Sequence, residues 1–218
     1  MKLARASLIV FVGAAWAQAP QLEPLPLVLP KPLFEGTPRN LKAPNLEKLS
    51  GKPRPPFLAP AGTVNVARGK AVTSSVSEPT SGDLEMITDG DKSGLDGAYV
   101  ELGSGVQWIA IDLKRKYNLY AIALWHYHKQ ARVYSDVIVQ VADDPDFVTN
   151  VRTIFNNDQD NTAGMGIGHD QNYIETNEGK LIDAKGVVGR YIRLYSNGND
   201  TTAVNHYVEV EAYGTPAQ

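Results

Sequence analysis

The sequence predicts an all-β protein, an antiparallel β-sandwich or barrel that follows a proline-rich extended N-terminal segment. Three observations support this prediction. Several short runs alternate apolar and polar residues with a period of two, as strands with one buried face do. β-Branched residues are frequent in these runs, and Gly, Asn and Asp separate them. No run has a convincing helical period, and short strands without intervening helices are typical of sandwiches and barrels.

Residues 1–17 have the pattern of a secretory signal peptide and are set aside from the fold prediction. Lys2 and Arg5 form a short positive region, an apolar stretch follows, and Ala15-Trp16-Ala17 has the small-x-small pattern of a cleavage site. No stretch reaches the ~18–20 apolar residues that a membrane span needs. We therefore expect an exported chain (periplasmic, cell-surface or extracellular) without a transmembrane span. A retained N-terminal anchor is the alternative.

Residues 18–62 form a proline-rich segment, because 11 of the 14 prolines lie between Pro20 and Pro60. Proline lacks an amide donor and fixes φ, so neither helix nor sheet propagates here, and an extended spacer is the first interpretation. The stretch Gln21–Phe34 carries five leucines, however, which is more apolar than a solvated linker usually is. Docking on the following domain or on a partner protein is therefore the alternative to a plain tether.

The composition limits the chemistry that the chain can perform. It has no cysteine, which excludes thiol nucleophiles and cysteine-ligated zinc and leaves oxygen or histidine as metal ligands. Residues 63–218 carry 13 Lys and Arg against 21 Asp and Glu, whereas residues 18–62 carry 6 against 3. An acidic domain without a basic stripe argues against nucleic acid as a partner, and acidic oxygens favour calcium.

Five runs within residues 63–218 are predicted to be strands. They are Gln107–Leu113, Asn118–His128, Asp136–Asp143, Arg190–Tyr195 and Tyr207–Tyr213. The second run is apolar almost throughout and is expected to be a central strand, whereas the last alternates apolar with acidic residues and should bury one face. Residues 155–180 form a long polar insertion, in which Asp158 and Asp160 offer a second calcium site; a solvated loop is the favoured interpretation.

Five motifs, in the right order, make residues 63–214 resemble discoidin or coagulation-factor type C domains. The motifs are NVARGKAVTSS (65–75), MITDGD (86–91), QWIAIDL (107–113), RYIRLY (190–195) and VEVEAYG (208–214). The resemblance implies a jelly-roll β-sandwich of the galactose-binding, carbohydrate-binding-module type over residues 63–218, in a bacterial exported protein. Domains of this family bind galactosides, other glycans, phospholipids or proteins, so it implies a binding module rather than an enzyme.

Many sugar-binding members of that family hold a structural calcium, and the resemblance carries its ligands onto this chain. The implied ligands are the carboxylates of Asp89, Asp91 and Glu209 and the backbone oxygens of Met86 and Val208. Six to eight oxygens at about 2.3–2.6 Å suit this ion. The family's threonine ligand falls on Gly94, which has no side chain, so Ser93 or Asp96 would have to substitute. An ordinary Asp-Gly turn with a solvated Glu209 is the alternative.

The family binds its ligands with loops at one end of the sandwich, and two polar segments supply the candidates here. The candidate ligand-binding residues are His126, His128, Arg132, Asn197, Asn199, Asn205 and His206. Strand alternation places Trp125 and Tyr127 on one side and the two neighbouring histidines on the other. Trp125 is expected in the core, and the histidines and Arg132 at the surface, where they would hydrogen-bond to sugar hydroxyls.

The favoured function is therefore an exported, non-catalytic module that binds a glycan or cell-surface polysaccharide and is stabilised by calcium. A protein-interaction or adhesion adaptor of the cell envelope, which binds an exported partner through the proline-rich segment, is the alternative. A metalloenzyme with His126, His128 and His206 on one ion is a remote alternative, because no H-E-x-x-H motif accompanies them. No G-x-S-x-G motif is present either, and no catalytic residue is predicted.

Overall fold

The computed structural model describes residues 20–34, 41, 43–48 and 50–217, and the predicted signal peptide lies outside them. These residues form eleven strands and one short 3-10 helix, with no described helix long or apolar enough to cross a membrane. The elements are β1 (Leu22–Pro24), β2 (Leu58–Pro60), β3 (Val64–Asn65), β4 (Val72–Ser74), η1 (Leu84–Thr88), β5 (Val100–Ser104), β6 (Gln107–Trp125), β7 (Ile138–Ala142), β8 (Arg152–Asn156), β9 (Lys180–Ser196), β10 (Val204–Tyr207) and β11 (Glu209–Pro216).

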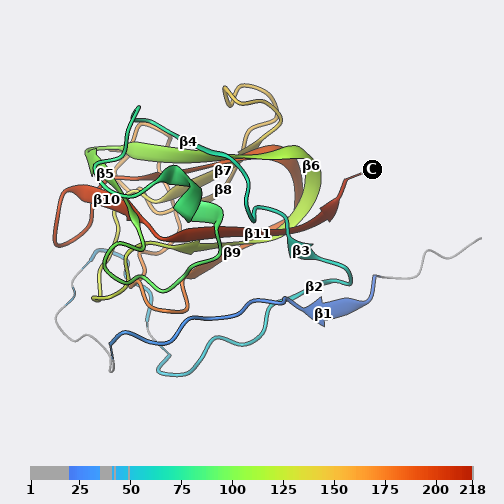
Figure 1. Ribbon diagram of the computed structural model, residues 1–218, viewed down its shortest axis with the longest axis horizontal. Helices are drawn as coiled ribbons and strands as arrows, with labels where there is room; N and C mark the ends of the chain where they lie inside the picture. Colours follow the sequence, from blue (N-terminus) through green and yellow to red (C-terminus); the bar gives the residue numbers. More distant parts are fainter. Residues whose placement is uncertain (1–19, 35–40, 42, 49, 218) are drawn as a thin grey trace, which may run out of the picture.

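All strand pairs of the sandwich are antiparallel, as the sequence predicts. The large sheet has the order β3-β11-β6-β9-β7-β8, with β4 also paired to β6, and β5 pairs with β10 separately. Ribbons of both groups enclose one core in Figure 1. The strands alone therefore build the domain, and η1 only closes the connection between β4 and β5.

The strand β6 joins two runs that the sequence analysis separates. Its register shifts between Asp112 and Tyr117, and Lys114 has a positive φ of 72°, so the strand bends there without ending. The first half pairs with β4 and the second half with β11. Figure 1 shows β6 curving over at one end of the molecule. The prediction of two separate strands is wrong, because the bend at Lys114, Arg115 and Lys116 leaves the pairing with β9 on both sides intact.

The alternation in two of the motifs is confirmed by the packing. Ile109, Ile111 and Leu194 are fully buried in the main core. On the opposite face of the sheet, Arg190 binds Asp112 with two hydrogen bonds, Nε to Oδ1 at 2.8 Å and Nη2 to Oδ2 at 3.0 Å. These hydrogen bonds hold the pKa of Asp112 well below its usual range. The aspartate of one motif and the arginine of the other therefore join β6 to β9 across the sheet.

The acidic residues of β11 are not on a solvated face, contrary to the simplest interpretation of their alternation. Glu209 is fully buried and Glu211 is 4% exposed. Lys92 forms an ion pair with Glu211 at 2.8 Å, and the Tyr213 hydroxyl donates to the same carboxylate at 2.7 Å. The segment after η1 therefore covers this face of β11 with a cation, which is how an acidic residue can be buried there.

The proline-rich segment, called the arm here (described residues 20–34, 41, 43–48 and 50–62), folds back along the sandwich (Figure 1). Its ends pair as β1 and β2, three residues each, and the pairing ends at prolines, as a residue without an amide donor requires. Leu27 packs against the small buried cluster of Ala123, Trp125 and Val208. Over the described residues the arm therefore contacts the sandwich and is not a free tether.

A second part of the arm is hydrogen-bonded to the loop that precedes β9. Arg54 donates from its guanidinium to the carbonyls of Glu178 and Gly179, at 2.8 and 2.9 Å. Asn172 donates to the carbonyl of Pro44 at 2.8 Å, and Asn177 to that of Pro30 at 3.0 Å. The arm therefore covers residues 172–180 from outside and forms one unit with the sandwich.

Candidate functional site

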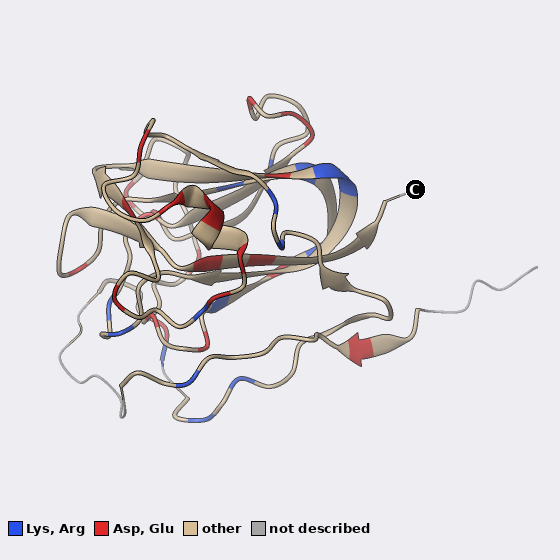
Figure 2. Cartoon of the chain, in the orientation of Figure 1, with Lys and Arg blue, Asp and Glu red and all other residues tan. Residues whose placement is uncertain are grey.

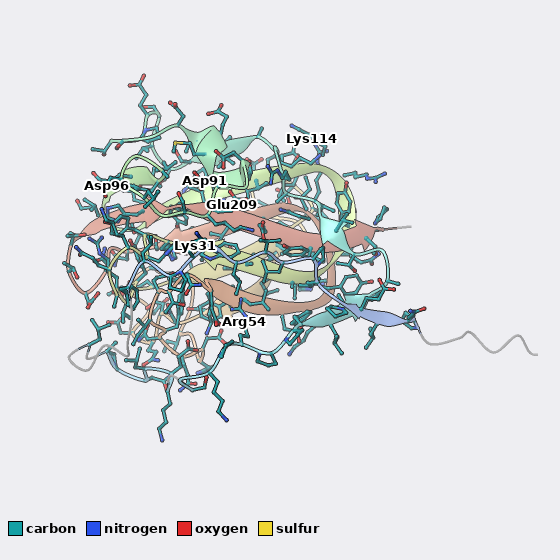
Figure 3. The ribbon with its side chains drawn as sticks, turned by 60° about the horizontal axis from the view of Figure 1, so that its bottom comes forward. Lys31, Arg54, Asp91, Asp96, Lys114 and Glu209 are labelled. Carbon is teal, nitrogen blue, oxygen red and sulfur yellow. The ribbon has the colours of Figure 1, made fainter. Side chains whose placement is uncertain are left out.

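Glu209 starts β11 and points toward the turn that follows η1; Figure 3 labels it beside Asp91 of that turn. Its Oε2 accepts a hydrogen bond from the Gly90 amide at 3.1 Å, and its Oε1 is buried without a partner in the described part of the chain. Burial, with the negative charges of Glu211 and Asp89, raises the pKa of Glu209 to about 9. A buried carboxylate with an unpaired oxygen is a group that a bound cation would neutralise.

The turn itself is shaped by its own aspartates. Asp89 Oδ1 accepts from the Asp91 amide at 2.7 Å, and Asp91 Oδ1 accepts from the Ser93 amide at 2.8 Å. Both side chains are exposed, and with Glu209 they do not form a group of three carboxylates within 4.8 Å. These three carboxylates alone therefore do not form a metal-binding group in the structure.

Gly94, where the family's threonine ligand falls, faces the imidazole of His128. A Cβ at Gly94 would lie 2.7 Å from His128 Nε2, and Gly94 has a positive φ of 62°. His128 is fully buried and its Nε2 donates to the Lys92 carbonyl at 3.0 Å. The surface position expected for His128 is therefore wrong, because the imidazole occupies the space above the turn. Asp96 pairs with Lys129 at 2.6 Å and is exposed.

His126 is also fully buried, and the surface position expected for it is wrong. Its Nδ1 lies 2.6 Å from Glu175 Oε1, and because a carboxylate only accepts, Nδ1 is the donor. Its ring stacks on Tyr134 with 4.2 Å between centroids. His126 Nε2 and Glu175 Oε2 are buried without partners among the described residues. The residues from 172 to 178 cover the histidine, which strand alternation alone does not indicate.

His206 links this buried pair to the rim of the sandwich. Its Nε2 lies 3.2 Å from Glu101 Oε2 and must donate to it, so Nδ1 accepts from the Tyr134 hydroxyl at 3.0 Å. Burial, with the positive charge of Arg132, lowers the pKa of His206 to about 4. The neutral imidazole therefore orients Tyr134 and Glu101 at neutral pH.

Arg132 lies over the ring of Tyr127, with its guanidinium carbon 4.6 Å from the ring centroid. Tyr127 packs edge-on against Tyr99 at 5.2 Å, and Tyr99 against His206 at 5.4 Å. Arg132 and Tyr99 are partly exposed. We call Tyr99, Glu101, Tyr127, Arg132 and His206 the rim cluster; it offers aromatic surface next to hydrogen-bonding groups.

We expect acidification to destabilise the protein through His206. Because the folded pKa lies below the unfolded value of about 6.5, the unfolded state takes up the proton first, and stability is lost as pH falls from about 6.5 toward 4. The loss should reach about 2 kcal/mol after allowance for solvent screening. Urea denaturation at several pH values measures it, and His206→Gln, which keeps two hydrogen-bonding ends, should flatten this part of the profile. An unchanged profile in the variant would contradict the assignment.

The three asparagines of the second polar loop hold the loop together. Asn205 donates to the carbonyls of Gly103 and Gly105 at 2.8 and 2.9 Å and is fully buried. Asn199 Oδ1 accepts from the amides of the turn that follows it, and Asn197 donates to Asp136 at 2.8 Å. Only His206 of this loop joins the rim cluster with Arg132.

Trp125 is in the core, as expected. It is fully buried, its Nε1 donates to the Asn177 carbonyl at 3.0 Å, and the ammonium of Lys92 lies 5.2 Å from its ring centroid. A Cβ at Gly179 would lie 2.6 Å from the Trp125 ring. This tryptophan therefore joins the arm-bound loop, the turn after η1 and β6.

The remote expectation of one metal held by three histidines is wrong. His126, His128 and His206 each have a different partner, namely Glu175, the Lys92 carbonyl, and Tyr134 with Glu101. Within the described ranges, no group of three ligand atoms within 4.8 Å includes any of them. The group of this kind that does occur there is Asp136, Asp158 and Asp160.

The acidic residues of the long insertion are largely occupied by the loop itself. Asp158 is fully buried and accepts from the amides of Thr162 and Ala163, at 3.1 and 2.9 Å. The Thr162 hydroxyl contacts Asp136 at 2.9 Å and Asp160 at 2.6 Å. These contacts explain why the acidic group folds compactly in the structure.

Sequence reasoning does not find Glu175, Tyr134, Tyr99 or Glu101. Glu175 follows Tyr173 and Ile174, and this short apolar pair in a polar insertion is the signal that the loop turns back into the core. Tyr134 ends the first candidate segment, but nothing in the sequence distinguishes it as a site residue. Tyr99 and Glu101 precede or begin β5, where no motif draws attention to them.

Comparison with known proteins agrees with this architecture. No family model matches the sequence, and no curated protein matches it either. One similar solved structure is CpGH89CBM32-4 from Clostridium perfringens, in complex with GlcNAc-alpha-1,4-galactose. It has a TM-score of 0.52 at 20% identity, and the match covers 72% of this chain and 97% of the CpGH89CBM32-4 chain. A fucose binding module of Streptococcus pneumoniae has a TM-score of 0.50 at 19% identity, and the match covers 71% of this chain and 98% of the chain of that module.

The chain has the fold of these modules. The discoidin-like, galactose-binding type of β-sandwich implied by the sequence motifs is thereby confirmed. A family 89 glycoside hydrolase from Clostridium perfringens also matches, with a TM-score of 0.52 at 20% identity over 71% of this chain. The discoidin-like chain spans only 15% of that hydrolase, so the likeness concerns one of its parts.

Proposed function

We propose that the chain is a non-catalytic carbohydrate-binding module. The observation that carries the proposal is the rim cluster, in which the partly exposed ring of Tyr99 lies near Arg132, whose Nε and Nη1 have no hydrogen-bond partner among the described residues. Rings that stack on sugar faces, with a few oriented polar groups, are what a sugar site needs. Two neighbours with the same fold support this proposal, one in complex with GlcNAc-alpha-1,4-galactose and one described as a fucose binding module.

The experiment is a glycan-array screen of the full chain, repeated with Arg132→Ala. We expect binding to one glycan class and at least a tenfold loss in the variant, because two or more hydrogen bonds and a stacked cation are removed (about 1.5 kcal/mol or more). Asn199→Ala is the control, because the Asn199 side chain hydrogen-bonds to the amides of the turn that follows it and lies outside the rim cluster. Equal loss in both variants, or no binding to any glycan by the folded chain, would overturn the proposal.

We also infer a structural calcium between the turn after η1 and β11. The unpaired, buried Oε1 of Glu209 supports it, and Asp89, Asp91, Glu209 and the backbone oxygens of Met86 and Val208 would hold the ion. When bound, the ion would supply a positive charge that joins two segments far apart in sequence. His128 and Lys92 already orient this turn, through the hydrogen bond of His128 and the ion pair of Lys92 with Glu211.

We infer that export, which the signal-peptide pattern predicts, accompanies this function. In the adaptor alternative the arm would bind a partner protein, whereas the described part of the arm contacts the chain's own sandwich.

A further inference from the structure

A second cavity lies away from the rim cluster, between the arm and the loop that precedes β9. Its volume is about 630 Å³, which is within the range of ligand sites. One wall is formed by the arm, with Phe34, Lys48, Lys52 and Arg54 among its residues, and the other by residues 173–181. We call it the arm groove. Figure 3 shows Arg54 between the arm and the sandwich.

The arm groove is held open by contacts that do not use its free cations. Arg54 is bound to the carbonyls of Glu178 and Gly179, while its own amide donates to the Glu178 carboxylate at 3.2 Å. Glu47 pairs with Lys180 at 2.7 Å. Glu47 is therefore paired with a cation, whereas the Glu178 carboxylate accepts from a main-chain amide and forms no ion pair with a described residue. The walls of the groove are tied together at several points.

The remaining charge of the groove is positive. Lys48 and Lys52 line it, and neither forms an ion pair with any described residue. Residues 63–218, in contrast, carry 13 Lys and Arg against 21 Asp and Glu. Figure 2 shows basic residues along the arm and acidic ones on the adjoining turn and β11. A polyanion would be repelled by most of the surface and attracted to the arm groove.

The arm groove suits a saccharide better than a peptide. An extended peptide binds by strand addition to a row of free amides, but Pro32, Pro53 and Pro55 have none and the amide of Arg54 is occupied. Proline and aromatic rings with exposed lysines instead offer flat apolar faces and cations for carboxylates. We propose that the arm groove binds an acidic polysaccharide, one whose sugars carry carboxylates, as a site separate from the rim cluster.

The test is calorimetric titration of the full chain at low salt with hexagalacturonate, with its fully methyl-esterified form, and with hexaglutamate. We expect the acid form to bind, the neutral ester to bind at least tenfold more weakly, and added salt to weaken the binding. The double variant K48A/K52A removes both cations and should reduce the affinity for hexagalacturonate about tenfold, because each exposed charge contributes roughly 0.7 kcal/mol. The double variant K114A/K116A removes the same charge from β6 and should bind normally.

Several outcomes would overturn the proposal. They are undiminished binding by K48A/K52A, equal binding of acid and ester, stronger binding of hexaglutamate, and no binding of hexagalacturonate at millimolar concentration. Loss of binding in Arg132→Ala with retention in K48A/K52A would place acidic sugars in the rim cluster and overturn it as well. The rim cluster is tested separately, by the effect of Arg132→Ala on the binding of neutral glycans. The proposal for one site can therefore be refuted while the proposal for the other stands.

Discussion

Calcium at millimolar concentration is expected to raise the melting temperature of the full chain by roughly 5–10 °C, and Glu209→Gln should abolish this response. Saturation about 100-fold above the dissociation constant contributes about 2.7 kcal/mol, and about 2–4 °C accompany each kcal/mol in a domain of this size. Because calcium displaces the proton that burial retains on Glu209, the response should grow between about pH 6 and pH 9. Differential scanning calorimetry with calcium or with a chelator measures it.

Two comparisons make this prediction specific. Without calcium, Glu209→Gln should be at least as stable as the parent chain, because the amide relieves the burial of a titratable group with a pKa of about 9. Asp160→Asn is the control, because Asp160 belongs to the other acidic group. A calcium response that survives Glu209→Gln and disappears in Asp160→Asn would place the ion in the long insertion and contradict the inferred site.

Trp125→Ala should cost about 4 kcal/mol of the free energy of unfolding. The ring is fully buried against Leu27, Ala123 and Val208, so its removal leaves a cavity, for which large-to-small changes cost about 3–5 kcal/mol. Its hydrogen bond to the Asn177 carbonyl is also lost, which adds about 1 kcal/mol at most. Urea denaturation followed by circular dichroism measures the change.

The matched control for this substitution is Trp108→Ala on the outer face of the same strand. Trp108 is only partly buried and contacts the guanidinium of Arg193, 4.4 Å from the ring centroid. Its removal should cost about 1 kcal/mol, because an exposed stacked cation contributes little more. An equal loss of unfolding free energy in Trp125→Ala and Trp108→Ala would mean that the arm and the loop do not bury Trp125.

The sequence predicts the sandwich well, because alternation and order of motifs depend on local pattern. Ile109, Ile111 and Leu194 enter the core as their spacing indicates. The bend in β6 is missed, because Lys114 gives no sign in sequence that a strand continues through its positive φ. The acidic positions of β11 are also misjudged, because Lys92, 119 residues earlier, supplies the charge that lets Glu211 be buried.

The candidate site, like the fold, is predicted only in part from the sequence. The turn at Asp89 is found from its motif, whereas the burial of His126 depends on a loop almost 50 residues later in the chain. Alternation determines which side of a strand a residue faces, but it does not determine which loop covers that side. Glu175, which contacts His126, and the arm, whose Leu27 packs against Trp125, are therefore visible only in three dimensions.

The anchoring of the arm through Arg54 has an evolutionary consequence. Its guanidinium binds the main-chain carbonyls of Glu178 and Gly179, which every amino acid possesses. Drift at position 178 should therefore leave these two guanidinium hydrogen bonds in place and remove only the one that the Glu178 carboxylate accepts from the Arg54 amide. Gly179 is fixed by its positive φ of 60° and by its approach to Trp125. Related sequences should accordingly tolerate many residues at 178, keep glycine at 179, and retain an arginine at 54 wherever the arm is retained.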